Sequence, residues 1–236
     1  QEVTFTRDVA PILYEKCVEC HRPGSFAPMS LLTYENARFY APLMKFRVQT
    51  RQMPPWHVDR TVGIQDYEND ASLTDEEIAT IVRWIDGGTI MGEREDMPSP
   101  PDLPEGGAWQ LEEQLGRPPD MIVQSDAYNV IANGQDQWWA PAVPFEGLDE
   151  PRWIQSYEFK PAYPLGMRVV HHGHTSLRFT DQTLGIAHYG VGKRYETFPP
   201  GVGMLVPEGE AQVVWNIHYF PVGEAVDNDV IEVGLW

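Results

Sequence analysis

The sequence has few cysteines, few basic residues and no long hydrophobic run. Its 236 residues include 17 Lys and Arg against 35 Asp and Glu, which gives a formal net charge of −18. This balance argues against nucleic acid and against an anionic membrane surface, because both attract basic side chains. No apolar stretch approaches the roughly 20 residues that a membrane-spanning helix needs. We therefore expect no membrane span, and either basic partners or only solvent around the acidic surface.

Both cysteines of the chain lie in a Cys-x-x-Cys-His run at residues 17–21. This run is typical of covalent haem attachment, because two thiols add to the vinyl groups and the adjacent imidazole reaches the iron. A redox dithiol or half of a zinc site are the alternatives. However, no βαβ pattern surrounds the run, and the next histidine is His57. The run therefore predicts haem c on Cys17 and Cys20, with His21 as an axial ligand and no disulfide.

Four side chains are candidates for the other axial position: Met29, Met44, Met53 and His57. Met29 is expected in a loop, and Met44 in the middle of a helix as part of the core. Two prolines follow Met53, end the helix and leave its thioether on a rigid corner. Thioether ligation also raises the haem potential toward the range of electron transfer. We expect Met53 to be the ligand, with His57 as the alternative.

The composition predicts a multidomain α + β chain. Residues 1–92 are expected to be helical, 93–117 form a linker rich in Pro, Gly and acidic residues, and 118–236 are rich in strands. Hydrophobic spacing predicts helices from Thr6, over 33–51 and after a capping box at Thr74. Apolar alternation broken by turns predicts an antiparallel sandwich or barrel in the last part. Its strands are expected at 152–159, 167–179, 183–189, 212–219 and 229–236.

Five of the seven histidines lie in the strand-rich part: His171, His172, His174, His188 and His218. On a regular strand His172 and His174 share one face and His171 lies on the other. A bulge or a twist could turn both His171 and His172 toward one ion. His218, on another predicted strand, is the best third ligand. Imidazole suits copper, zinc and iron, so the residues alone predict a metal site without choosing between copper and zinc.

Residues 5–88 resemble the cytochrome c domains that many environmental bacteria fuse to other modules. The resemblance rests on Phe5–Leu13, Cys17–His21, Met53–Trp56 and Leu73–Gly88. It implies a small all-α cytochrome c domain over residues 1–92 whose haem iron is ligated by His21 and Met53.

Residues from about 117 to 236 resemble the N-terminal half of the copper type II, ascorbate-dependent monooxygenases, the peptidylglycine and dopamine hydroxylase family. The resemblance implies a jelly-roll-like antiparallel sandwich that binds one copper ion, the electron-donating one, through His171, His172 and His218. The matching stretches are Val169–His172, Tyr195–Gly203, Val213–Tyr219 and Val230–Leu235.

The sequence also departs from this family. Gly173 and His174 stand where the family has an apolar residue and a hydrophobic strand, so His174 is a further candidate ligand. His188 has no counterpart and is either a ligand or a surface residue. The family's disulfides are absent. So is its second half, which binds the oxygen-activating copper through a His-x-His pair and a Met.

Together these features predict a secreted haem–copper protein of the bacterial periplasm or exterior that transfers single electrons. We expect a redox partner protein, and a monooxygenase centre on a missing C-terminal domain or another subunit. One alternative is a stand-alone copper oxidase or monooxygenase. The other is a structural electron-conduit cytochrome whose β-domain holds no metal. The opening Gln1–Thr4 fits a mature N-terminus, and the strand-like end at Val230–Trp236 suggests a longer polypeptide.

Overall fold

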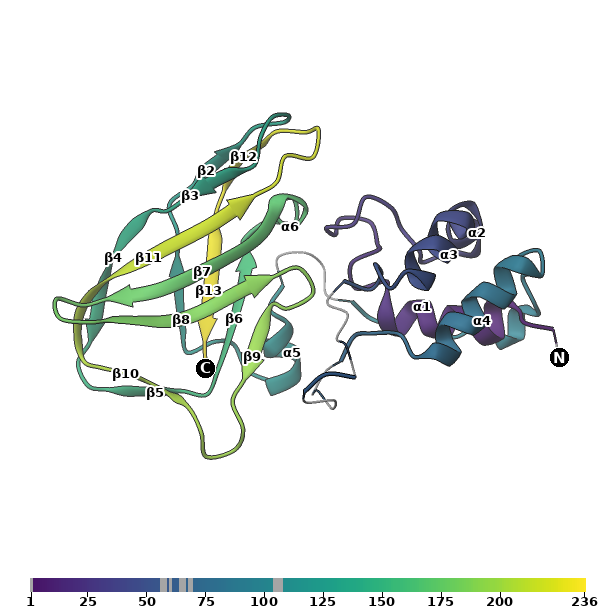
Figure 1. Cartoon of the computed structure of the whole chain (residues 1–236). Helices are drawn as coiled ribbons and strands as arrows, with labels where there is room; N and C mark the ends of the chain where they lie inside the picture. The colour runs from purple at the N-terminus through teal and green to yellow at the C-terminus, as the bar shows by residue number, and fades with distance from the viewer. Residues whose placement is uncertain (1, 56–58, 60, 64–66, 68–69, 104–107) are drawn as a thin grey trace. The chain divides into compact units, whose positions relative to one another are not determined.

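The computed structural model describes residues 2–55, 59, 61–63, 67, 70–103 and 108–236. The chain divides into two compact units, Gln1–Pro23 with Ala27–Leu103, and Gly24–Phe26 with Pro104–Trp236 (Figure 1). The boundary after Leu103 falls inside the predicted linker. Within the described ranges, no helix has both the length and the apolar character needed to cross a membrane.

The first unit is built from short helices, as predicted. Its core contains the fully buried side chains of Phe5, Leu13, Ile81 and Trp84, and Met44 is also buried, as expected. The helix predicted over 33–51 is divided into two, because Pro42 lacks an N–H and starts a new helix in its first turn. The helices are η1 (Phe5–Val9), α1 (Ala10–Lys16), α2 (Tyr34–Phe39), α3 (Ala41–Gln49), α4 (Asp75–Asp86) and η2 (Arg94–Asp96).

The predicted capping box at the start of α4 is confirmed. The Thr74 hydroxyl accepts a hydrogen bond from the Glu77 N–H at 3.2 Å, and the Glu77 carboxylate accepts one from the Thr74 N–H at 2.7 Å. Each contact satisfies a backbone donor that has no partner inside the helix. The helix ends at the predicted stop, where Gly87 is the C-cap and Gly88 has a φ of 92°.

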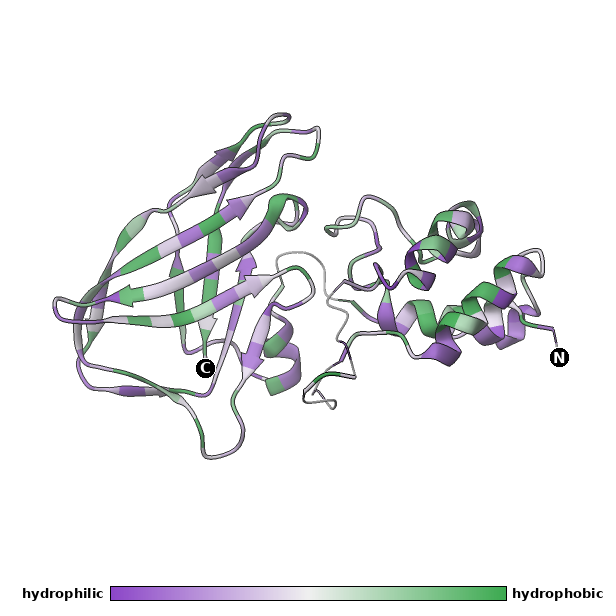
Figure 2. Cartoon of the chain, in the orientation of Figure 1, coloured by the Kyte–Doolittle hydropathy of each residue, from purple (hydrophilic) through white to green (hydrophobic). Residues whose placement is uncertain are grey.

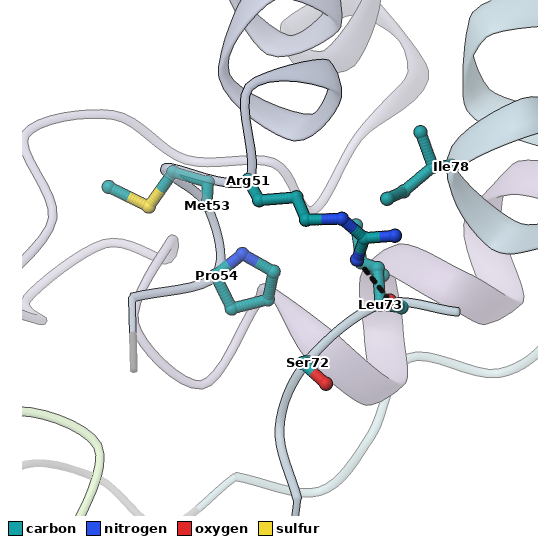
Figure 3. A pocket seen from close by; sticks show the side chains of 6 residues that line it. All are labelled: Arg51, Met53, Pro54, Ser72, Leu73 and Ile78. Atoms are coloured by element: carbon teal, nitrogen blue, oxygen red, sulfur yellow. Dashed lines mark hydrogen bonds between the residues drawn. The ribbon is translucent and has the colours of Figure 1, made fainter. Parts of the chain in front are cut away.

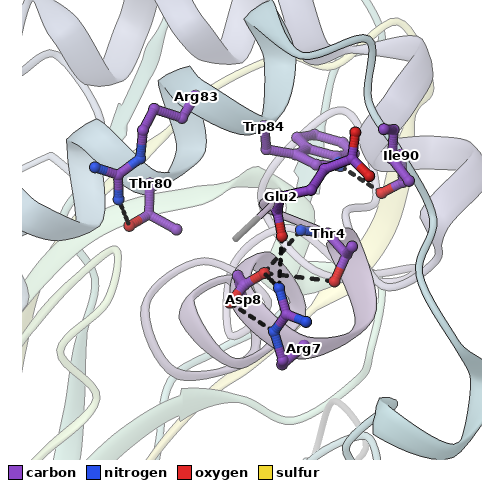
Figure 4. A network of polar contacts seen from close by, with 8 residues as sticks. All are labelled: Glu2, Thr4, Arg7, Asp8, Thr80, Arg83, Trp84 and Ile90. Atoms are coloured by element: carbon purple, nitrogen blue, oxygen red, sulfur yellow. Dashed lines mark hydrogen bonds and ion pairs between the residues drawn. The ribbon is translucent and has the colours of Figure 1, made fainter.

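Polar contacts also tie the N-terminal segment to the chain that follows α4 (Figure 4). The Asp8 carboxylate accepts hydrogen bonds from the Thr4 N–H at 2.7 Å and from the Arg7 guanidinium at 2.8 Å. The carbonyl of Ile90 accepts from the Trp84 indole and from the Phe5 N–H, both at 2.9 Å. Ile90 thereby joins the N-terminal segment to Trp84 of α4.

The second unit consists mainly of two antiparallel sheets, and every strand pair identified among the described residues is antiparallel. One sheet has the order β1-β13-β6-β9. The other has the order β3-β11-β7-β8, with β4 also paired to β11. The first contains β1 (Met121–Gln124), β13 (Ile231–Leu235), β6 (Ser156–Pro161) and β9 (Tyr195–Thr197); the second contains β3 (Gln137–Trp139), β4 (Ala142–Leu148), β11 (Gly209–Tyr219), β7 (Val170–Arg178) and β8 (Thr183–Gly190). Two ribbons complete the unit: β5 (Arg152–Ile154) with β10 (Met204–Val206), and β2 (Tyr128–Val130) with β12 (Val226–Asp229).

The two sheets share one hydrophobic core. The ring of Phe159 on β6 lies 6.0 Å from that of Trp215 on β11 and 5.3 Å from that of Tyr189 on β8. Burial alternates along much of β7 and β11, so one face of this sheet is buried and the other is more exposed. Figure 2 shows that β7 is mainly hydrophilic. The arrangement is compatible with the predicted antiparallel sandwich, and its outer face carries the histidines.

Two short helices lie where the sequence predicted other structure. Residues 167–169, expected in a strand, belong to α6 (Gly166–Val169), and the strand begins only at Val170. Within the predicted linker, α5 (Gln110–Leu115) is part of the second unit because the Glu158 carboxylate accepts hydrogen bonds from the N–H groups of Gln110 and Leu111. The linker is therefore shorter than residues 93–117.

Candidate metal centre

A β-bulge brings His171 and His172 to the same face of β7. In the ladder with β11, His172 is opposite His218 and Val170 is opposite Tyr219, so His171 is the extra residue between two pairs. Neither His171 nor His172 is buried, whereas Val170 before them and Gly173 after them are. Of the two distortions that the sequence left open, a bulge or a twist, the strand contains a bulge, and it gives two adjacent side chains the same outward direction.

The three imidazoles of His171, His172 and His218 point one nitrogen each at a common centre. Their Nδ1 atoms are 3.1 Å apart for His171 and His172, 3.2 Å for His171 and His218, and 3.3 Å for His172 and His218. Two nitrogens at about 2.0–2.1 Å from one tetrahedral ion lie about 3.3 Å from each other. The spacing of this three-histidine cluster therefore fits a single metal ion, and these three residues form a possible ion site in the described chain.

Asp136 and Trp138 both contact the His218 ring, one at its Nε2 atom and the other on its face. The Nε2 atom of His218 is 2.7 Å from Asp136 Oδ2, which leaves Nδ1 for an ion. A carboxylate on the outer nitrogen of a ligand histidine fixes both its tautomer and its orientation. The indole of Trp138 stacks on the same imidazole, with centroids 4.3 Å apart and an interplanar angle of 2°. Sequence reasoning missed both residues, because nothing in the spacing links positions 136–138 with 218.

Burial favours the neutral form of the imidazoles. His218 is 8% exposed, His172 is half-buried and His171 is exposed. Burial lowers the pKa of His171 and His172, and the charge of His218 lowers both further. A neutral imidazole is the form that binds a metal ion, so the lowered pKa of His171 and His172 suits them to that role at neutral pH.

His174 and His188 lie outside this three-histidine cluster. His174 is opposite His188 in the β7–β8 ladder and opposite Asn216 in the β7–β11 ladder. It shares the outer face with His172, as the alternation of a strand predicts. The geometry does not group His174, a further candidate ligand from the sequence, with the three-histidine cluster, and its ring contact is with His188.

The Cys-x-x-Cys-His run forms a tight turn at the end of α1. The N–H of His21 donates to the carbonyl of Cys17 at 2.9 Å, and that of Cys20 donates to the same oxygen at 3.2 Å. The His21 Nδ1 atom is 3.2 Å from the Met29 carbonyl, which leaves Nε2 for a ligand. An outer hydrogen bond of this kind orients metal-binding imidazoles. The arrangement fits His21 as an axial haem ligand.

No disulfide joins Cys17 and Cys20, and burial raises the pKa of the Cys17 thiol to about 12 and of the Cys20 thiol to about 11. Reactive dithiols have a lowered pKa, because the thiolate is the nucleophile. The surroundings therefore disfavour the redox dithiol that the sequence left as an alternative. Burial also lowers the pKa of His21.

Of the three methionine candidates for the sixth ligand, Met53 is the most exposed. The residue is 39% exposed, Met29 is half-buried and contributes its carbonyl to His21, and Met44 is 5% exposed. Met53 lies beside a small cavity of about 10 Å³ that Arg51, Pro54 and Leu73 help to line (Figure 3). That volume is about the space of one water. His57 lies outside the described residues.

We compared the sequence with models of known protein families and with curated proteins, and neither comparison gives a match. The arguments for function therefore rest on the residues and their geometry.

Proposed function

We propose that the chain transfers single electrons between a haem c, held by Cys17, Cys20, His21 and Met53, and one copper ion. The observation that carries the proposal is the convergence of three Nδ1 atoms within 3.1–3.3 Å of one another. In this proposal residues 1–92 are a cytochrome c domain and residues 118–236 are a jelly-roll-like copper domain.

The side chains of the protein have defined tasks in this function. Cys17 and Cys20 attach the haem, while the Met29 carbonyl orients His21 through its Nδ1 atom. His171, His172 and His218 present one nitrogen each to the copper, and Asp136 holds the ring of His218. When bound, haem iron and copper each gain or lose one electron. Joining both sites in one chain raises their effective concentration toward each other.

We further propose that this protein is the electron-delivery part of a copper-dependent monooxygenase in the bacterial periplasm or outside the cell. Its partners are then a redox protein that supplies electrons and an oxygen-activating copper domain or subunit. Support comes from the three-nitrogen set, which holds the ion by imidazoles alone, and from the net charge of −18, which suits association with a basic partner.

Stopped-flow absorption of the haem-loaded full chain tests electron transfer between the two sites. The haem is reduced without oxygen and mixed with one equivalent of Cu²⁺, and its oxidation is followed by the loss of the reduced absorption bands. We expect a phase whose rate does not depend on copper concentration, because the electron moves within one chain. The control is the variant H171A/H172A/H218A, in which the phase that depends on the three-histidine cluster should be lost.

Two outcomes contradict the proposal. The first is an identical time course for the wild type and the H171A/H172A/H218A variant. The second is a colourless wild-type protein, made in a host that matures haem c, whose two thiols both react with an alkylating agent. The variant C17A/C20A should lose covalent haem completely and keep its copper, which separates the two sites.

A second candidate function is oxygen or peroxide chemistry at the same copper. The observation that favours it is the exposure of His171, which leaves the open side of a three-ligand set accessible to small molecules. Oxygen uptake and peroxide formation by the reduced, copper-loaded full chain measure this activity. Uptake that disappears in H171A/H172A/H218A supports it, whereas uptake equal to that of the copper-free chain excludes it.

A further inference from the structure

The second unit also has an open pocket of about 330 Å³ beside the three-histidine cluster, and we call it the side pocket. It lies where β7 and β8 face β6, β9 and β10, and the side chains that matter for its chemistry are Tyr157, His174, His188, Glu196, Phe198 and Met204. The pocket has a polar part and an apolar part. Its size is in the range of small-ligand sites.

Two of these side chains, His174 and His188, are directly opposite each other on neighbouring strands. Their ring centroids are 6.5 Å apart, compared with 4.8–5.3 Å between the rings of the three-histidine cluster. Side chains at facing positions have Cβ atoms about 4.5–5.5 Å apart. Both histidines are exposed, and a rotation of the His174 side chain alone can turn its ring toward that of His188.

His174 and His188 each keep a ring nitrogen that can bind an ion. The Tyr157 hydroxyl is 2.7 Å from Nδ1 of His188 and 3.4 Å from its Nε2, so the shorter bond involves Nδ1 and Nε2 remains for an ion. This is the outer contact that orients ligand imidazoles. Within the described part of the chain, the His174 imidazole makes no hydrogen bond. It is therefore free to turn.

Glu196 supplies a carboxylate on the same side. Its Oε2 atom is 3.5 Å from the Tyr157 hydroxyl and 2.6 Å from Nζ of Lys193, so one phenol links this carboxylate and His188. Two imidazoles and one carboxylate suit first-row transition metals. We propose that His174, His188 and Glu196 form a second site for a divalent transition-metal ion, Cu²⁺ or Zn²⁺, separate from the three-histidine cluster.

Metal stoichiometry of the haem-loaded full chain tests this second site. The protein is cleared of loosely bound metal with a chelator, then titrated with Zn²⁺ or Cu²⁺ alone against a coloured competitor. We expect two equivalents for the wild type, one for H171A/H172A/H218A, one for H174A/H188A and none for the combination. Because Zn²⁺ undergoes no redox change, the result does not depend on the electron-transfer proposal.

The variants distinguish failure of this site from failure of the first. If H171A/H172A/H218A binds no ion while H174A/H188A binds one, the second site is overturned and the first stands. If H171A/H172A/H218A keeps one ion that the further change H174A/H188A does not remove, the ion is bound elsewhere and the second site is again overturned. H174Q/H188Q, which keeps polar side chains, should behave as H174A/H188A does if loss of binding is due to ligand loss.

Tyr157 gives a finer test in the H171A/H172A/H218A background. Tyr157→Phe removes the hydrogen bond to Nδ1 of His188. It should lower the affinity for the remaining ion by about 10–100-fold. The electron paramagnetic resonance spectrum of Cu²⁺ in that background should show coupling to two nitrogens. A spectrum without nitrogen coupling contradicts the pair as ligands.

Discussion

In the first unit three of the four candidate haem ligands are neighbours in sequence, whereas in the second unit His218 meets the other two candidate ligands only because strands pair. Cys17, Cys20 and His21 lie within one turn that is closed by the hydrogen bond from the His21 N–H to the Cys17 carbonyl. His172 and His218 are 46 residues apart and meet because β7 and β11 pair in a fixed register. The first arrangement is local, and the second exists only when the sheet is complete.

The cap of α4 and the contacts that support the second unit differ in the same way. In the first unit the capping box of α4 joins Thr74 and Glu77, three residues apart. In the second, Asp136 supports His218 from 82 residues away, and Glu158 pairs with Arg194 36 residues away. We therefore expect substitutions in the second unit to have larger effects on stability. These effects should also extend to residues far away in the sequence.

Loss of the buried charge of Glu158 should have the largest effect on stability. Glu158 is fully buried, its carboxylate is 2.9 Å from the Arg194 guanidinium, and it also accepts from the first N–H groups of α5. Glu158→Gln leaves the buried Arg194 without its counter-charge. We expect a loss of about 3–5 kcal/mol in the free energy of unfolding, the range for breaking a buried ion pair, measured by urea denaturation.

Glu150→Gln is the matched control. Glu150 pairs with Arg152 at 2.9 Å, and both side chains are more than 60% exposed. Exposed pairs contribute about 0–1 kcal/mol, so this variant should unfold almost as the wild type does. Equal effects of the two substitutions are incompatible with a buried pair that holds α5 on the second unit.

The buried carboxyl group of Asp229 should make stability depend on pH. Burial raises the pKa of Asp229 from 3.8 to about 7, although the Tyr219 hydroxyl donates to it at 3.0 Å. Because the folded pKa is the higher one, its contribution is fully present below about pH 4 and is lost as the pH rises through about 7. The difference in pKa corresponds to at most on the order of 4 kcal/mol.

The variant Asp229→Asn isolates this contribution from other groups. The difference in unfolding free energy, wild type minus Asp229→Asn, should fall steadily as the pH is raised from 4 to 8, measured by urea denaturation at each pH. The exposed neighbour Asp227 provides the control Asp227→Asn, whose difference from the wild type should stay nearly constant. A flat profile for Asp229→Asn contradicts a raised pKa.

The local features were predictable from the sequence. The Cys-x-x-Cys-His run, the capping box at Thr74 and the glycine stop at Gly87 each rest on a spacing of a few residues. Even the bulge at His171 could be anticipated, because two adjacent histidines can serve one ion only if the strand alternation is broken. Such signals are complete within a short window of the chain.

The long-range features were not predictable in the same way. The sequence predicted five strands but gave no pairing, and short strands such as β3 have no periodic signal of their own. Trp138 meets His218 only through the β3–β11 register. Likewise α5 was assigned to a linker, because the partner of its N-terminus is Glu158, more than 40 residues later. The helix at 166–169 is a single turn, too short to show helical periodicity.

Removal of the carboxylate beside His218 should weaken metal binding without unfolding the protein. Asp136 is 43% exposed, and its Oδ2 atom contacts Nε2 of His218 at 2.7 Å. Asp136→Asn should lower the copper affinity of the full chain by about 10–100-fold, the usual effect of losing a hydrogen-bond partner of a ligand histidine. The competition titration with H174A/H188A as background measures it. Asp126→Asn, at another exposed aspartate, should leave the affinity unchanged; an equal loss there would point to net charge instead.

The smallest expected effect on stability lies in the first unit, at the cap of α4, whose two hydrogen bonds are local. Thr74→Ala removes the hydroxyl that accepts from the Glu77 N–H at 3.2 Å, and should lower the unfolding free energy by about 1 kcal/mol. Thr80→Ala, inside α4, is the control and should be neutral or slightly stabilising, since alanine favours helix. Glu77→Ala and the double variant complete a double-mutant cycle measured by thermal unfolding. Because Thr74 and Glu77 cap each other, their effects should add to more than the effect of the double variant. Strict additivity would mean that the two contacts act independently, and that α4 is held by tertiary packing rather than by its local cap.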